Sequence, residues 1–261
     1  MIDTDVTGAG VALSLLLVAV AIALSWWQRL GLQRPLAWAS VRAVVQLVVV
    51  GTALTIVIDE GSPPALWWTW VVVMVLFAAE TVHRRAPEVP SARWLALSAY
   101  GAASAVTLGV LFGLGVFPLE GRTLVPLSGM MVGNSMNATV LVARRIVEEL
   151  RDKRPEVEAR LALGQPSREA ARPYVRAALR TALTPQIETT RAVGLVFLPG
   201  AMTGLILAGV EPVDAVLVQV VVMYLVLGAV ATTTVTVAVG LARRLFTSDH
   251  RLVRLPRPAD A

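Results

Sequence analysis

The chain of 261 residues is 56% hydrophobic and 16% charged, contains no cysteine and has a formal charge of +5. A soluble domain carries about 25% charged residues, and the absence of cysteine excludes disulfides, thiolate metal sites and thiol catalysis within the chain. The apolar runs are continuous rather than alternating, which excludes a membrane barrel of ~10-residue strands. The composition therefore predicts an all-α integral membrane protein, organised as a single transmembrane domain over residues 1–261.

Seven apolar stretches are long enough to cross a membrane. A helix needs about 20 apolar residues to span a hydrocarbon core of ~30 Å. The N-terminus carries two aspartates and no basic region, so we expect the first apolar run to be a retained span rather than a cleaved signal peptide. The predicted spans are residues 8–27, 36–58, 64–82, 94–117, 123–143, 184–210 and 213–242.

The basic residues predict how these spans are oriented. Of the 23 lysines and arginines, all except Arg42, Arg122 and Arg191 lie between or after the spans on one side of the membrane. Cytoplasmic loops retain such residues, so the N-terminus is expected outside and the C-terminus in the cytoplasm of a multi-pass cell (inner or plasma) membrane protein. The basic excess is thus a topology signal with a secondary role in contacting membrane lipids, and it requires no nucleic acid.

A few charged side chains remain within the predicted spans. Arg42 and Gln46 share a helix face, and Glu80 near the end of the next span is a candidate partner for Arg42. Glu188 and Arg191 have the spacing of a local ion pair. Such groups are costly in hydrocarbon and face the bundle interior or a wet cavity. Two interpretations stay open: structural ion pairing near the interface, or a cation path through Glu188 with Arg191 holding its orientation.

The fifth predicted span contains amides and thioethers, in the run GMMVGNSMNAT at 129–139. Carboxamide oxygen from Asn134 and Asn137 and thioether sulfur from Met130 can line a weak, transient metal site. With Glu188, Met130 forms the candidate metal-binding set. The alternative is structural, because methionine is adaptable packing material and asparagine in a span often bonds to a neighbouring helix.

The chain lacks the residues for nucleotide binding or catalysis. A phosphate-binding P-loop needs Gly-Lys-Ser/Thr, and the only lysine, Lys153, occurs in Arg-Asp-Lys-Arg. No Ser/His/Asp arrangement and no two-histidine zinc spacing is present. We therefore expect a non-catalytic subunit without a cofactor of its own. If transport uses ATP, then ATP and Mg²⁺ must bind to a partner chain.

A polar cytoplasmic segment at about 144–183 separates the fifth and sixth spans, and it is long for a connection in a compact bundle. A helix is expected to continue out of the membrane, pause at Pro155 and end at Gly164, with Pro166 in the first turn of the next helix and a kink at Pro173. This segment is either a solvated or lipid-facing surface or a docking element for a partner. Its basic stripe consists of Arg168, Arg172, Arg176 and Arg180.

Several stretches resemble a known family. Glu158, Ala159 and Gly164 match the E-A-x-x-x-x-G spacing of the coupling motif of ABC-transporter permeases. The wider pattern resembles the FetB/YbbM-like permease family, which includes an iron exporter and plant aluminium-tolerance proteins. The chain departs from the usual family form at Gln165, where a Ser or Thr cap is expected, and at Pro173. The matching stretches are residues 41–51, 129–138, 161–170 and 176–216 and the following Gln219.

The resemblance implies the permease subunit of an ATP-binding-cassette exporter that moves iron-like metal ions out of the cytoplasm. It implies a cytoplasmic ABC ATPase as partner and a permease homodimer. It also implies a coupling helix between spans five and six that inserts into the ATPase. The residues expected to couple to the ATPase are Glu158, Ala159, Gly164, Glu169 and Ala170.

The expected translocation path runs along the fifth, sixth and last spans, past Asn134, Asn137, Glu188, Arg191 and Gln219. The alternative function is a stand-alone ion-coupled transporter or channel, with Arg42, Glu80 and Glu188 as a charge relay. No inverted repeat is visible in the sequence to support that alternative. A membrane enzyme has no catalytic constellation to support it.

Overall fold

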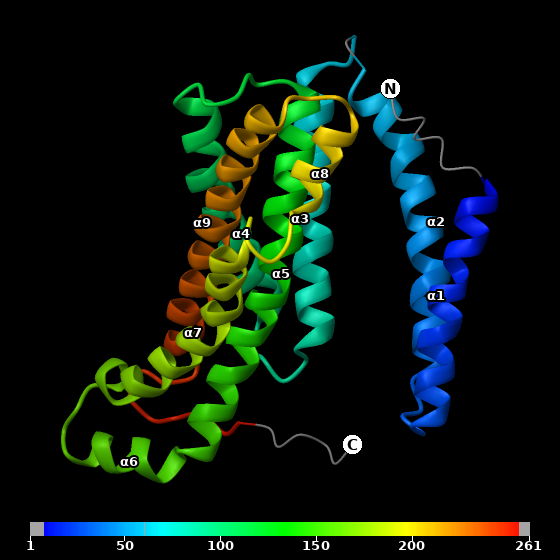
Figure 1. Ribbon diagram of the computed structural model, residues 1–261. Helices are drawn as coiled ribbons and strands as arrows, with labels where there is room; N and C mark the ends of the chain where they lie inside the picture. Colours follow the sequence, from blue (N-terminus) through cyan, green and yellow to red (C-terminus); the bar gives the residue numbers. More distant parts are fainter. Residues whose placement is uncertain (1–7, 60, 256–261) are drawn as a thin grey trace.

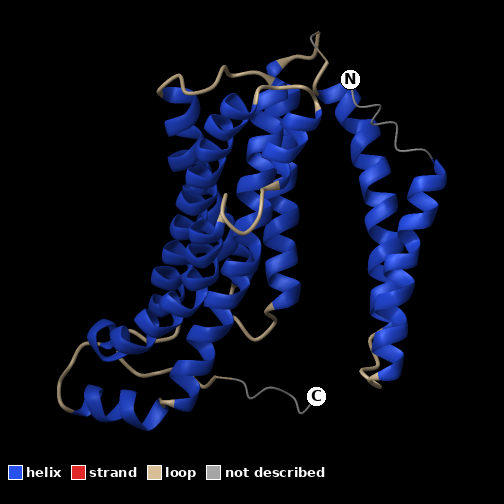
Figure 2. Ribbon diagram, in the orientation of Figure 1, coloured by secondary structure: helices blue, strands red, loops and turns tan. Residues whose placement is uncertain are grey.

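The computed structural model describes residues 8–59 and 61–255, which form nine α-helices and no strand (Figures 1 and 2). The all-helical class is therefore confirmed. Among the described helices, α2, α3, α4 and α9 are long and apolar enough to cross a membrane, and α1 holds a shorter apolar stretch, Ala12–Trp27. The full count of seven spans and the orientation stay predictions. The helices are α1 (Gly8–Trp27), α2 (Gln33–Val57), α3 (Pro64–Arg85), α4 (Ala92–Gly113), α5 (Gly121–Asp152), α6 (Arg154–Ala162), α7 (Ser167–Ala192), α8 (Gly200–Leu207) and α9 (Pro212–Arg244).

α5 and α9 form the centre of the bundle, with α3 and α4 packed on one side and α7 on the other (Figure 1). Small side chains allow this close packing: Ala99 and Ala103 of α4 and Ala229 and Ala238 of α9 are fully buried. Helices in membranes associate through such small residues because their backbones can then approach closely. The core consequently combines close helix contacts at small residues with buried large side chains such as Tyr100 and Met131.

The hairpin of α1 and α2 stands apart from this bundle (Figure 1). Only Val57 among the α2 residues is buried, and Arg42 in the middle of α2 is exposed. Glu80 instead binds Arg84 of its own helix and Arg93 of α4, each at 2.8 Å. The predicted pairing of Arg42 with Glu80 is therefore wrong, because α2 makes few contacts with α3 and the two side chains lie on separate bodies of the fold.

The sixth predicted span is a broken helix. α7 ends at Ala192, residues 193–199 are not helical, and α8 then follows, whereas the apolar pattern predicts one segment over 184–210. Gly194 adopts a φ of +83°, which L side chains rarely adopt, and its N–H donates to the carbonyl of Phe197 at 3.0 Å. Pro199 has no N–H to donate and stands at the N-cap of α8. In Figure 1 this break lies midway along the bundle, beside α5.

Below the bundle, α5 extends to Asp152 and leads into α6, which a tight turn joins to α7 (Figure 1). Gly164 ends α6 with a φ of +84°. The pause expected at Pro155 lies instead at Lys153, between α5 and α6, and Pro155 falls in the first turn of α6. Pro166 is the N-cap of α7 rather than part of its first turn. α7 runs through Pro173 without interruption, so that residue does not end the helix.

Candidate functional site

A cavity of about 270 Å³ lies beside the break between α7 and α8. Four parts of the chain form its wall: α5, the upper half of α7, the non-helical break with the start of α8, and the first half of α9. Non-helical backbone at membrane depth is tolerated only where protein buries it or where it lines a wet cavity. The lining residues are Met130, Asn134, Gln186, Thr189, Thr190, Val193, Phe197, Pro199, Gly200, Ala201, Gln219, Val222, Met223 and Val226.

Gln219 is the least satisfied polar group of this cavity. Its side chain is only 7% exposed, and its Oε1 atom has no hydrogen-bond partner. A buried polar atom without a partner costs about 1–3 kcal/mol, so Gln219 Oε1 is the lining atom that would gain most from a molecule bound in the cavity. Gln219 is brought to this place by α9, which is anchored in the core farther along its length by residues such as Ala229 and Val230.

The other polar groups of the cavity are neutral. Asn134 donates from Nδ2 to the carbonyl of Met130 at 2.8 Å, and this bond leaves its Oδ1 unused. The hydroxyls of Thr189 and Thr190 donate to α7 carbonyls one turn earlier, at 2.9 and 2.8 Å. None of the described lining residues is ionisable. The cavity therefore offers amide oxygen, amide N–H and thioether sulfur rather than charge.

The structure brings three predicted site residues to this cavity, namely Met130, Asn134 and Gln219. Asn137 lies elsewhere, and its Oδ1 accepts a hydrogen bond from Arg85 at 3.1 Å. Asn137 lies about one turn farther along α5, where its partner is Arg85 at the end of α3 rather than the break.

Glu188 and Arg191 also lie outside the cavity lining. They form the predicted i,i+3 ion pair, with 2.8 Å between Oε1 and Nη1, on an exposed face of α7. Met130 and Glu188 consequently do not share a site. No group of three histidine, aspartate or glutamate side chains that would hold a metal ion occurs in the described part of the chain.

Two further lining residues that carry an amide or a thioether were not among the predicted site residues. Gln186 lies on the face of α7 that turns toward α5 and α9, and Met223 follows Gln219 by one helical turn. The polar Gln186 within an apolar predicted span was a usable signal. Met223 gave no sequence signal beyond its spacing from Gln219, because methionine is a common packing residue in membrane helices.

The second candidate region is the turn formed by α6, residues 163–166 and the start of α7. Val157 of α6 is fully buried in the lower core, and the Tyr174 hydroxyl on α7 donates to Glu156 Oε2 at 2.9 Å. Lys153 donates to the other oxygen of Glu156 at 3.0 Å, and these bonds hold the pKa of Glu156 below its usual value. α6 is therefore attached to α7 by both apolar and polar contacts.

The C-terminal segment ties the same turn to α9. The Arg154 guanidinium donates to the carbonyls of Leu252 and Val253 at 3.1 and 3.3 Å. His250 Nδ1 lies 3.0 Å from the hydroxyl of Ser167, the first residue of α7. Both ends of the turn are consequently held against the segment that follows α9.

The predicted coupling residues take different positions in this turn. Glu158 and Ala159 are exposed on α6, and Glu158 binds Arg154 at 2.7 Å. Gly164 and Glu169 are also exposed, whereas Ala170 is fully buried and faces the core. Sequence reasoning missed the apolar tip of the turn, Leu163, whose side chain is 82% exposed.

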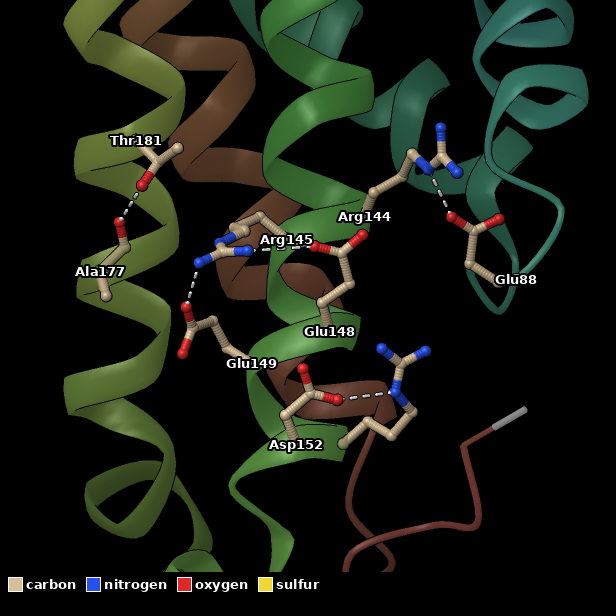
Figure 3. A network of polar contacts seen from close by, with 9 residues as sticks. Glu88, Arg144, Arg145, Glu148, Glu149, Asp152, Ala177 and Thr181 are labelled. Carbon is tan, nitrogen blue, oxygen red and sulfur yellow. Dashed lines mark hydrogen bonds and ion pairs between the residues drawn. The ribbon is translucent and has the colours of Figure 1, made fainter. Parts of the chain in front are cut away.

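Ion pairs cover the neighbouring surface of α5 (Figure 3). Arg144 binds Glu88 of the α3–α4 loop at 2.7 Å, and Arg145 binds Glu149 at 2.8 Å and Glu148 at 3.3 Å. Exposed pairs of this kind each contribute about 0–1 kcal/mol. They therefore neutralise this face of the helix more than they stabilise the fold.

Comparison with known proteins places these features in a family. A model of the uncharacterised protein family UPF0014 matches residues 9–246. "UPF0014 membrane protein STAR2" of Oryza sativa subsp. japonica is 40% identical over 81% of this chain and 74% of its own length. "Protein ALUMINUM SENSITIVE 3" of Arabidopsis thaliana is 32% identical over 92% and 88%. "Probable iron export permease protein FetB" of Escherichia coli (strain K12) is 31% identical over 95% and 96%. These matches confirm the resemblance seen in the sequence, and no solved structure matches the chain.

Proposed function

The chain belongs to the UPF0014 family, and on this basis we propose that it is the transmembrane permease subunit of an ATP-binding-cassette exporter. It is a membrane protein of a family in which one relative carries the name of a probable iron export permease. In the proposed assembly, two copies of the chain join two copies of a cytoplasmic ABC ATPase in the cell (inner or plasma) membrane. ATP and Mg²⁺ then bind to the ATPase, and this chain is non-catalytic.

The observation that carries this proposal is the path of α7. This one helix of 26 residues begins at the exposed cytoplasmic turn and ends at the cavity, which its residues Gln186, Thr189 and Thr190 line. At 1.5 Å per residue the helix is about 39 Å long. A displacement applied at Ser167 would consequently reach the cavity through one continuous helix, which contains Pro173 and Pro185.

The cavity beside the break is the proposed translocation site. Discontinuous helices form the substrate sites of many transporters, because the interrupted backbone and the helix ends supply polar groups at membrane depth. Gln219 and Asn134 would contact the substrate directly. Asn137, Glu188 and Arg191 lie off this path in the described conformation, and Glu188 and Arg191 would flank its exit on the face of α7.

The proposed cargo is a metal ion with iron-like chemistry, as the name of the relative from Escherichia coli suggests. Met130 and Met223 supply thioethers, and Gln219 supplies an amide oxygen. A neutral ligand set binds a cation weakly, and weak binding favours release during transport. The metal set predicted from the sequence is thereby revised, with Gln219 in place of Glu188.

The stand-alone transporter draws no support from the described residues. Its charge relay required Arg42, Glu80 and Glu188 to act together. Arg42 is exposed on the separate hairpin, Glu80 is bound to two arginines, and Glu188 is bound to Arg191.

The test is co-purification with an ABC ATPase from the native membrane. The turn 163–166 is the proposed docking element, so Leu163→Glu should abolish co-purification because it places a charge on the exposed apolar tip. Leu114→Glu is the matched control, since Leu114 is also exposed, at 76%, but lies at the opposite end of the bundle. An ATPase that remains bound to Leu163→Glu, or transport by the purified chain in liposomes without nucleotide, would contradict the proposal.

The cargo is tested separately in the reconstituted complex. Iron, manganese, cobalt or aluminium ions should stimulate ATP hydrolysis, and Gln219→Leu should weaken this response. A complex that hydrolyses ATP but responds to none of these ions would reject the metal cargo while leaving the permease assignment intact.

A further inference from the structure

A second cavity lies at the cytoplasmic end of the bundle, between the first turns of α7 and the last turns of α9. Its volume is about 410 Å³, and it is far from the translocation cavity along both helices. Its floor is apolar and its rim is strongly basic. The lining residues are Ser167, Arg168, Glu169, Arg172, Val175, Ala238, Val239, Ala242 and Arg243.

The three arginines of this rim have no acidic partner. In the described part of the chain, no ion pair or hydrogen bond involves the guanidinium of Arg168, Arg172 or Arg243. Glu169 is the one carboxylate among the described lining residues, and it pairs with none of them. The rim therefore keeps a net positive charge that the protein itself does not neutralise.

On the neighbouring face of the molecule, at the same end of the bundle, arginines are neutralised by carboxylates of the protein. On α5 and α6, four arginines each bind a carboxylate, namely Arg144, Arg145, Arg151 and Arg154 (Figure 3 labels the first two). The arginines around this cavity thus differ from the four paired arginines of α5 and α6. This difference indicates that an external anion belongs there.

The apolar floor identifies the kind of anion. Ala238, Val239 and Ala242 belong to the last turns of α9, a helix apolar enough to cross a membrane, and Val175 faces them from α7. Arg243 lies in the last turn of α9, where basic residues mark the cytoplasmic membrane surface. A cleft with a basic rim at the headgroup level and apolar walls toward the hydrocarbon fits a lipid better than a soluble anion or a protein surface.

We propose that this cleft binds an anionic phospholipid of the cytoplasmic leaflet, with its phosphate between Arg172 and Arg243 and its acyl chains along Val175 and Val239. Guanidinium groups recognise phosphate oxygens through paired N–H donors. Because the lipid bridges α7 and α9, it holds the first turns of α7 against the last turns of α9. The site is independent of the proposed transport function, since it rests on the charge and shape of the cleft alone.

The test is native mass spectrometry of the full chain, purified and exchanged into phosphatidylglycerol or phosphatidylcholine of the same acyl chains. Phosphatidylglycerol should be retained preferentially, and Arg172→Gln/Arg243→Gln should weaken its retention about tenfold or more, because each basic group near an anionic surface contributes appreciably. Both arginines are exposed and unpaired, so these variants should fold. Arg172→Lys/Arg243→Lys should retain most of the lipid.

Arg180→Gln is the matched control, because Arg180 belongs to the same basic stripe of α7 but lies outside the cleft. An equal loss in Arg180→Gln would overturn the proposal in favour of diffuse charge attraction. Displacement of the lipid by millimolar inorganic phosphate would overturn it in favour of a free-anion site. Loss of a bound ATPase in the double variant, with lipid preference unchanged, would overturn it in favour of a protein contact.

Discussion

Replacing Gln219 by leucine should stabilise the protein and impair transport at the same time. Gln219 is 93% buried and its Oε1 has no partner within the protein. An unsatisfied buried polar group costs about 1–3 kcal/mol, and removing it in favour of an apolar group of similar size recovers part of that cost. For a chain of this size, each 1 kcal/mol raises the midpoint of thermal unfolding by about 2–4 °C.

The same substitution would remove the proposed hydrogen bond to the cargo. One neutral hydrogen bond contributes about 0.5–1.5 kcal/mol, so the apparent affinity for the transported substrate should fall about two- to tenfold. The change in stability is measured by thermal unfolding in detergent, monitored by tryptophan fluorescence. The change in apparent affinity is measured by substrate-stimulated ATP hydrolysis in the reconstituted complex.

Ser128→Ala is the matched control for this experiment. Ser128 on α5 is also buried with an unpartnered oxygen, but it does not line the cavity. It should gain stability while substrate response stays unchanged. If Gln219→Leu lowers the unfolding temperature, or if both variants lose substrate response equally, the reasoning that assigns Gln219 to the cargo is refuted.

Three further predictions concern stability and are measured by thermal unfolding in detergent. Gly121→Ala should destabilise the protein by about 1–3 kcal/mol through overpacking, because the added Cβ would lie 2.7 Å from an indole nitrogen; an unchanged midpoint would contradict this. Gly194→Ala should cost about 1–2 kcal/mol at its φ of +83°, whereas Gly204→Ala within α8 meets no neighbour and should stabilise slightly. Lys153 lowers the pKa of Glu156, so the stabilising bond is present above the usual value of 4.5 and is lost as pH falls through the lower folded value. Glu156→Gln should therefore be less sensitive to acidification below about pH 4.5 than the unchanged chain, and equal sensitivity would contradict the assignment.

The sequence predicted helices well wherever local chemistry decides. Continuous apolar runs gave the positions of α2, α3, α4 and α9, and Gly164 marked the end of α6 because glycine tolerates the conformation that ends a helix. The break at 193–199 was not predicted. Its residues are as apolar as a span, and only the combination of Gly194 and Pro199 with tertiary packing interrupts the helix there.

The candidate site was predicted only in part, for a related reason. Asn134 stood out as a polar residue in an apolar span, and such residues tend to face the interior. Gln219 was singled out only through the resemblance to the permease family. Sequence spacing along one helix cannot tell which neighbouring helix faces it. The sequence therefore suggested Arg42 as a partner of Glu80, although the separate position of the α1–α2 hairpin keeps the two side chains apart.

The packing of α7 explains how motion would reach the cavity. Its buried residues are Ala170, Ala171, Tyr174, Ala178 and Ala182, and no residue beyond Ala182 is buried. Four of the five are alanines, so the lower half of α7 offers a smooth face to the core that it shares with α5 and α9. Packed helices with such faces slide past one another through small shear displacements.

Ala178→Leu should block this sliding. Ala178 is fully buried, and the larger side chain overpacks the contact at a cost of about 1–3 kcal/mol. Binding of the ATPase should persist because the turn at 163–166 is untouched, whereas transport should be lost. Ala177→Leu is the matched control, since Ala177 is exposed one position earlier on the same helix. Transport at an unchanged rate by a complex with Ala178→Leu would show that movement of α7 against the core is not required. The cavity would then have to open through α8 and the break alone.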